Sequence, residues 1–138
     1  AIVMNYKYPE LFAASYLVAC QWDPKEVSTM ARNNLWITVS TGDAKAYPGM
    51  NAITSELIKR GATVAKDSWR ADYTDAQFLE GARKVIAQKS NIKYTTLEKS
   101  TNPYLPKDAN PGLEHSGTWK VAYSIPGIKD WMFLQSKQ

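Results

Sequence analysis

Two residues have side chains suited to proton transfer and lie where a catalytic site would use them. His115 is the only histidine among 138 residues, and histidine is the side chain whose charge changes near neutral pH. It follows residues 100–112, which carry three prolines and two Asn-Pro steps and are therefore predicted to be a loop. Asp43 comes just after Leu35–Ser40, the strongest strand pattern in the chain. An acid and a histidine in this order indicate the last two members of a hydrolytic triad, in which the acid orients the imidazole that takes a proton from a hydroxyl.

The third member of such a triad, the nucleophile, is not found in its usual setting. Many serine hydrolases present it in a Gly-x-Ser-x-Gly turn between a strand and a helix, and the sequence contains no such pentapeptide. Several serines lack the flanking glycines and are assigned no role, namely Ser40, Ser55, Ser116 and Ser124. The first residues have the apolar spacing of a helix already under way. We therefore expect the nucleophile to precede Ala1 and the chain alone to be inactive.

The apolar pattern predicts strands that alternate with helices. Strands are predicted at residues 16–22, 35–40, 62–69 and 92–97, the last with one solvated face. A short helix or helical turn is predicted at 24–32, and helices are predicted at 50–60, from 73–75 to about 90, and from 118 with a kink or a restart at 125–127. This order favours an α/β fold, a mostly parallel sheet flanked by helices. In such sheets the working groups lie at the carboxyl ends of the strands.

Composition excludes several other classes of protein. The chain suits one domain, and its 17 basic residues against 13 acidic ones give a net charge of +4 that is spread out, so no nucleic-acid partner is predicted. No apolar stretch reaches the ~18 residues that a membrane span needs. One cysteine, Cys20, and one histidine cannot form a zinc site, and there is no Gly-x-Gly-x-x-Gly, Walker or Cys-x-x-Cys motif. We therefore predict neither a cofactor nor a metal.

Three parts of the chain resemble known hydrolases. Residues 8–14, Tyr-Pro-Glu-Leu-Phe-Ala-Ala, are similar to the sequence that follows the nucleophile helix of α/β-hydrolase esterases, and residues 35–50 are similar to their acid-bearing strand and the helix after it. His-Ser-Gly-Thr-Trp at 115–119, followed by Ala-Tyr at 122–123 and Asp-Trp-Met-Phe-Leu-Gln at 130–135, resembles their histidine loop and closing helix. The esterases concerned are related to polyhydroxybutyrate depolymerases, feruloyl esterases and prolyl-oligopeptidase-like peptidases.

The resemblance implies that residues 1–138 are one partial α/β-hydrolase domain that begins just after the nucleophile turn. It implies His115 as general base and Asp43 as triad acid, with the oxyanion-hole donors outside the chain. Many relatives place the acid in Gly-x-x-Asp, which would put Lys45 at that position; lysine cannot act as the acid, so Asp43 with a shorter turn is assigned. Residues 62–91 are longer than the usual connection and are predicted to be an inserted strand and helix. Relatives are often exported, so secretion or a periplasmic location is an expectation of the resemblance alone.

Four aromatic residues are candidate substrate contacts. Trp119 follows His115 by four positions and shares a helical face with it, as does Tyr123, although such residues are more often core anchors. Tyr47 precedes Pro-Gly and is more often part of a turn and helix start. Trp22 ends a predicted strand at the edge where a pocket is expected.

The sequence therefore predicts the C-terminal half of a serine hydrolase that cleaves carboxylic esters. A peptide is the main rival substrate, and a non-catalytic binding or interaction domain that keeps the hydrolase pattern is a second hypothesis. Without the preceding strands of a larger sheet, residues 16–22 would present an unpaired apolar edge, which is a template for pairing with another chain. We therefore also predict either a homodimer through that edge or a chain that is one piece of a longer polypeptide.

Overall fold

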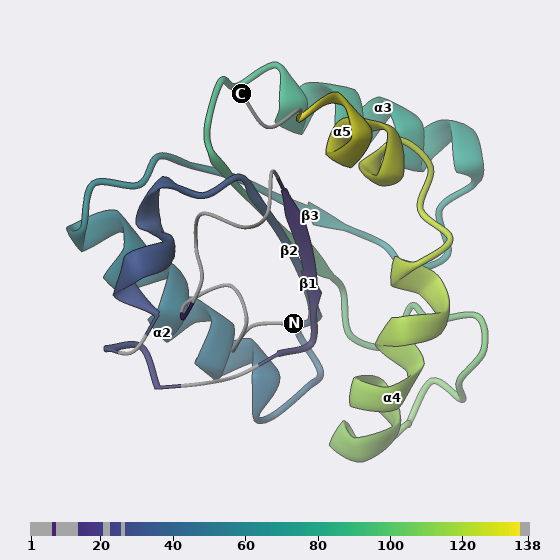
Figure 1. Cartoon of the computed structure of the whole chain (residues 1–138). Coiled ribbons are helices and arrows are strands. Elements are labelled where there is room, and N and C mark those ends of the chain that lie inside the picture. Colours follow the sequence, from purple (N-terminus) through teal and green to yellow (C-terminus); the bar gives the residue numbers. More distant parts are fainter. Residues whose placement is uncertain (1–6, 8–13, 21–22, 26, 136–138) are drawn as a thin grey trace.

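Four parallel strands form one sheet in the described part of the chain, and their spatial order is β1-β2-β4-β3 (Figure 1). The structure is a computed structural model that describes residues 7, 14–20, 23–25 and 27–135. Strand β1 (Ser15–Val18) pairs with β2 (Leu35–Ser40), which pairs with β4 (Ile92–Leu97). Strand β3 (Val64–Trp69) lies on the far side of β4. The predicted α/β fold class is confirmed, because helices flank this parallel sheet.

Helices cover both faces of the sheet (Figure 1). They are the 3₁₀ helix η1 (Ser28–Arg32) and the α-helices α2 (Ala46–Lys59), α3 (Asp75–Ile86), α4 (Pro111–Ala122) and α5 (Ile128–Leu134). Helix α2 and η1 lie on one face, and α3, α4 and α5 lie on the other. All residues of β2 are buried, because successive side chains point to opposite faces and both faces are covered. None of the described helices is both long enough and apolar enough to span a membrane.

The two central strands lie at the residues predicted from the sequence, but the predicted solvated face of β4 is wrong. Five of its six residues are buried, since β4 has β2 on one side and β3 on the other and its faces are covered. Strand β1 ends at Val18, where Ala19 takes a positive φ of 51°, whereas a strand over 16–22 was predicted. Residues 21 and 22 lie outside the described residues. Of the short helix or helical turn predicted at 24–32, the structure has the 3₁₀ turn of η1.

Two helices begin earlier than the sequence predicts. Helix α4 begins at Pro111 and not at Thr118: Asn110 caps it by accepting a hydrogen bond from the N–H of Leu113 (2.9 Å), and proline fits the first helical position because its missing N–H has no helical partner there. The Asn-Pro step interpreted as a loop signal is therefore a helix start. Helix α2 likewise begins four residues before Met50, with Pro48 in its first turn.

Residues 62–91 contain β3 and α3, which lie at the edge of the sheet beyond β4. Helix α3 starts with a capping box in which Thr74 and Gln77 bond each other's backbone N–H groups, and it packs on β3. This arrangement leaves β4 directly beside β2. Ser40 is level with Leu97 in the register, so the two strands that precede Asp43 and His115 end side by side.

Candidate active site

Asp43 lies in the turn between β2 and α2, with its side chain buried. The residue is 2% exposed, and its N–H donates to the carbonyl of Ser40 (3.1 Å), which closes the turn. Its Oδ1 accepts hydrogen bonds from the backbone N–H groups of Lys45 (3.1 Å) and Ala46 (2.9 Å) at the start of α2. A carboxylate at this place satisfies N–H groups that have no partner within the helix and is stabilised by the helix dipole. The first turn of α2 therefore fixes one oxygen of Asp43 and leaves Oδ2 for another partner.

That partner is His115. Its Nδ1 is hydrogen-bonded to Oδ2 of Asp43, and the His115 side chain is 45% exposed whereas that of Asp43 is 3% exposed. An ionised carboxylate only accepts, so Nδ1 is assigned as the donor, and in the neutral imidazole Nε2 then keeps a lone pair. Within the described residues Nε2 has no hydrogen-bond partner. A buried carboxylate thus holds one edge of an imidazole whose other edge can accept a proton.

A pocket opens beside this pair. It has a volume of about 400 Å³ and is lined by the start of α2, the start of α4 and the pair itself: residues Asp43, Ala44, Lys45, Ala46, Pro111, Gly112 and His115. His115 lies in the second turn of α4 and not on the preceding loop, which corrects the sequence-based expectation. A helix holds a side chain more precisely than a loop does. The rigid start of α4 therefore sets the place of the imidazole.

Comparisons with known proteins show the fold. No family model matches the sequence, and no curated protein matches it. A solved structure described as the crystal structure of a thermostable esterase matches with a TM-score of 0.62 and 16% sequence identity. This chain shares its α/β fold with an esterase. The match covers 96% of this chain and 27% of the esterase chain, so this chain spans about a quarter of that protein's length.

The four serines considered in the sequence are not placed as nucleophiles for His115. Ser40 Oγ is bonded to Glu114, and the hydroxyls of Ser116 and Ser124 donate to carbonyls of their own helical turns. Ser55 is exposed on α2. None of these hydroxyls bonds to His115. The geometry therefore offers no reason to assign any of them a catalytic role.

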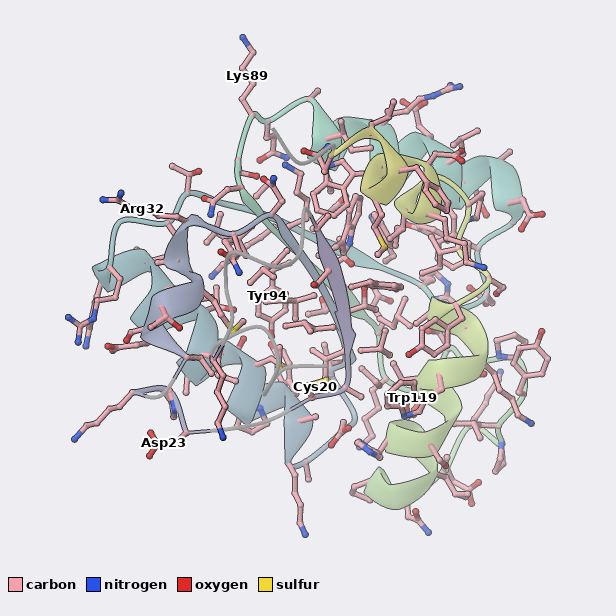
Figure 2. The ribbon with its side chains drawn as sticks, viewed as in Figure 1. Cys20, Asp23, Arg32, Lys89, Tyr94 and Trp119 are labelled. Carbon is pink, nitrogen blue, oxygen red and sulfur yellow. The ribbon has the colours of Figure 1, made fainter. Side chains whose placement is uncertain are left out.

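The predicted substrate contacts that lie within the described residues do not line the pocket of His115. Trp119 projects from α4, is 37% exposed and packs against Tyr123, with 5.4 Å between the ring centroids (Figure 2). Tyr47 lines a separate hollow of about 340 Å³ together with Tyr94, a residue of β4 whose hydroxyl bonds to α2 (Figure 2). Trp22 lies outside the described residues. Substrate contact by these aromatic residues stays a prediction.

Sequence reasoning missed Glu114, which precedes His115 and is 2% exposed. It shares a buried face of α4 with Gly117, Thr118 and Val121, which follow at the helical spacing of three, four and seven residues. That spacing would have revealed a buried carboxylate, but only to a reader who began the helix at Pro111. Among the described residues no group of three or more histidine, cysteine, aspartate or glutamate side chains is arranged to hold a metal ion.

Proposed function

We propose that this chain supplies the acid and the base of a serine hydrolase that cleaves carboxylic esters. The observation that carries the proposal is the hydrogen bond between Nδ1 of His115 and the buried carboxylate of Asp43, made where two parallel strands end. This arrangement is the one that general-base catalysis on a hydroxyl needs: one ring nitrogen held, the other able to accept a proton. The esterase fold match supports the choice of carboxylic esters as substrates.

In the proposed reaction a serine hydroxyl attacks the ester carbonyl while Nε2 of His115 takes its proton. Asp43 stabilises the imidazolium that forms and keeps the ring in position. The tetrahedral intermediate then breaks its bond to the leaving oxygen, to which His115 returns the proton, so that an alcohol leaves and an acyl-enzyme remains. Water, deprotonated by His115, attacks the acyl group and releases the acid and the free serine.

The nucleophilic serine of this proposal belongs to a part of the natural polypeptide that precedes Ala1. Two observations support it: the serines considered above have no hydrogen bond to His115, and the sequence lacks Gly-x-Ser-x-Gly. The esterase that shares the fold is also much longer than this chain. The 138-residue chain alone is accordingly expected to show no esterase activity.

A fluorophosphonate probe tests the proposal on the polypeptide isolated from its natural source. The probe reacts with activated serines, so peptide mapping should find it on one serine within Gly-x-Ser-x-Gly, outside this chain, and His115→Ala should abolish labelling. Nitrophenyl esters and peptide anilides assayed side by side then separate an esterase from a peptidase of the same fold. The proposal would be wrong if the probe labelled a serine of this chain. It would also be wrong if a polypeptide that carries the pentapeptide were not labelled at all.

A second candidate is a non-catalytic binding or interaction domain that keeps the hydrolase pattern. The absence of the pentapeptide from the sequence favours it. If the natural polypeptide begins at Ala1, this candidate replaces the first. Asp43→Asn and His115→Ala would then leave binding of the partner unchanged, whereas both would abolish turnover in a hydrolase.

A further inference from the structure

Glu114 is a buried carboxylate that the proposed reaction does not use. Its Oε2 accepts a hydrogen bond from the hydroxyl of Ser40 (2.8 Å), and its Oε1 accepts one from the backbone N–H of Ser100 (3.0 Å). A carboxylate withdrawn from water is costly unless both oxygens find donors. These contacts meet that need, and each comes from a different part of the fold.

The carboxylate of Glu114 joins three segments. Ser40 is the last residue of β2, Ser100 lies three residues beyond the end of β4, and Glu114 itself is in the first turns of α4. Ser100 has a positive φ of 66°, a backbone conformation that costs free energy in residues other than glycine. The hydrogen bond to Glu114 fixes the turn that contains this residue.

The same contacts lead to both members of the proposed catalytic pair. Glu114 immediately precedes His115 in α4. On the other side, Ser40 Oγ, which donates to Glu114, accepts a hydrogen bond from the N–H of Gly42 (3.1 Å), the residue before Asp43. A continuous set of hydrogen bonds therefore runs from the residue before the base to the residue before the acid.

The turn at Gly42 is packed directly against this carboxylate. A Cβ atom added to Gly42 would lie 2.8 Å from both Cγ and Cδ of Glu114 and 3.0 Å from Cγ of Lys99. Such distances are too short for unbonded carbon atoms, and the glutamate is held in place by its own hydrogen bonds. The turn that carries Asp43 and the helix that carries His115 therefore touch through Glu114.

We propose that Glu114 is the positioning residue of the Asp43–His115 pair. Its carboxylate ties the start of α4 to the ends of β2 and β4 and so sets the separation between Nδ1 of His115 and Oδ2 of Asp43. The consequence of this positioning for catalysis rests on the proposed function, but the separation of His115 and Asp43 can be tested without measuring turnover. A displacement of about 1 Å in a catalytic group can lower a rate about 100-fold, so this residue would matter without touching substrate.

Asn91 offers a matched control, because it plays the corresponding structural part at the opposite end of the sheet. Its Nδ2 donates to the carbonyls of Ala31 (2.7 Å) and Asn33 (2.8 Å), and its Oδ1 accepts from the N–H of Thr63 (2.9 Å). It thus also joins several segments, at the amino end of β4. Loss of Asn91 should lower stability without acting on His115.

The experiment uses nuclear magnetic resonance of the full 138-residue chain, in which the only imidazole is that of His115. The wild type should show a low-field Nδ1 proton, shielded from exchange with water by its bond to Asp43, and Asp43→Asn should remove that signal. In Glu114→Ala we expect exchange of this proton to be at least about tenfold faster, because a buried charge-assisted network is lost. In Asn91→Ala the exchange rate of this proton should stay within about twofold of wild type, because Asn91 lies at the opposite end of the sheet and shares no partner with His115.

Two milder variants apply if Glu114→Ala does not fold. Glu114→Gln keeps the shape and one acceptor, and Ser40→Ala removes one donor; both should give rates between those of wild type and Glu114→Ala. The positioning role would be overturned if the folded Glu114 and Ser40 variants exchanged the Nδ1 proton at the wild-type rate. It would also be overturned if Asn91→Ala sped this exchange as much as Glu114→Ala does. Either result would leave the Asp43–His115 pair itself intact. Absence of the low-field signal from the wild type would instead remove the pair, and with it both proposals.

Discussion

The imidazole of His115 is hydrogen-bonded to the carboxylate of Asp43, a residue 72 positions earlier in the chain. Parallel strands explain how such distant residues meet: β2 and β4 are neighbours, they end at the same level, and each is followed by a segment that turns over the same edge. The order of the strands in the sheet matters here, since β3 lies on the far side of β4 and does not separate the ends of β2 and β4.

The proposed function predicts that Asp43→Asn abolishes ester hydrolysis by the natural polypeptide while leaving its fold intact. Asparagine can still accept the two N–H groups of α2 through its amide oxygen, but it cannot stabilise a protonated imidazole or hold the Nδ1–H tautomer. By analogy with other triads we expect kcat to fall about 10⁴-fold. Steady-state kinetics measure this loss, and thermal unfolding checks the fold.

Asp72→Asn is the matched control for that substitution. Asp72 is an exposed carboxylate whose pKa is lowered by hydrogen bonding to Arg70, and it lies on the segment after β3. Exposed ion pairs contribute little to stability, so the variant should keep wild-type kcat and unfolding temperature. Equal losses of kcat in both variants would contradict a specific role for Asp43.

Asn91→Ala should destabilise the chain by about 2–4 kcal/mol, because it breaks several hydrogen bonds and leaves backbone groups of Ala31, Asn33 and Thr63 without their partner. Urea unfolding followed by circular dichroism gives the change in the free energy of unfolding. An exposed residue nearby, Lys89→Ala, should change it by less than about 0.5 kcal/mol. A loss below about 1 kcal/mol for Asn91→Ala would mean that these bonds are replaced by water at no net cost.

Much of the fold could be predicted because, in the central strands, the residue types that favour a strand are also the ones that the buried middle of the sheet requires. The run of Leu35–Ser40 is rich in β-branched and aromatic residues, and these residues form β2. The start of α4 could not be predicted in the same way, because Asn-Pro is a signal both for a loop and for a capped helix start. The choice depends on what the following residues pack against.

The candidate site was predictable to a similar degree. The order of Asp43 and His115 on an alternating pattern indicated where each would lie, and the structure brings them into contact. The burial of Glu114 follows from the helical spacing only once α4 is known to begin at Pro111, and its donors, Ser40 and Ser100, could not be predicted because they come from elements distant in sequence. A carboxylate on an amphipathic helix is ordinarily assigned to the solvent side.

Tyrosine ionisation should be linked to unfolding at high pH. Burial raises the pKa of Tyr16 and of Tyr94 well above the usual value near 10. Since the folded pKa is the higher one, the stability that comes from keeping these phenols neutral is fully present below pH ~10 and is lost as pH rises through the folded values. Tyrosinate absorbance should therefore rise in two stages, the second coinciding with loss of circular dichroism. A Tyr94→Phe variant should show a smaller second rise in absorbance. If all tyrosines instead titrated in one smooth step while the chain stayed folded, the prediction would be contradicted.

The edge of the sheet at β1 gives the last prediction. Among the described strands β1 pairs only with β2, and the N–H of Ala19 donates to that neighbour, so the alternate N–H groups of Tyr16 and Val18 are directed to the other side. An apolar edge of this kind pairs readily with another strand, and we predict that the chain dimerises through it. Light scattering on a size-exclusion column should give twice the 15.5 kDa of one chain. Val18→Pro removes an edge N–H that β2 does not use and should return the chain to a monomer. A wild-type monomer whose amides exchange slowly along the whole of β1 would contradict the dimer, because its edge would already be protected.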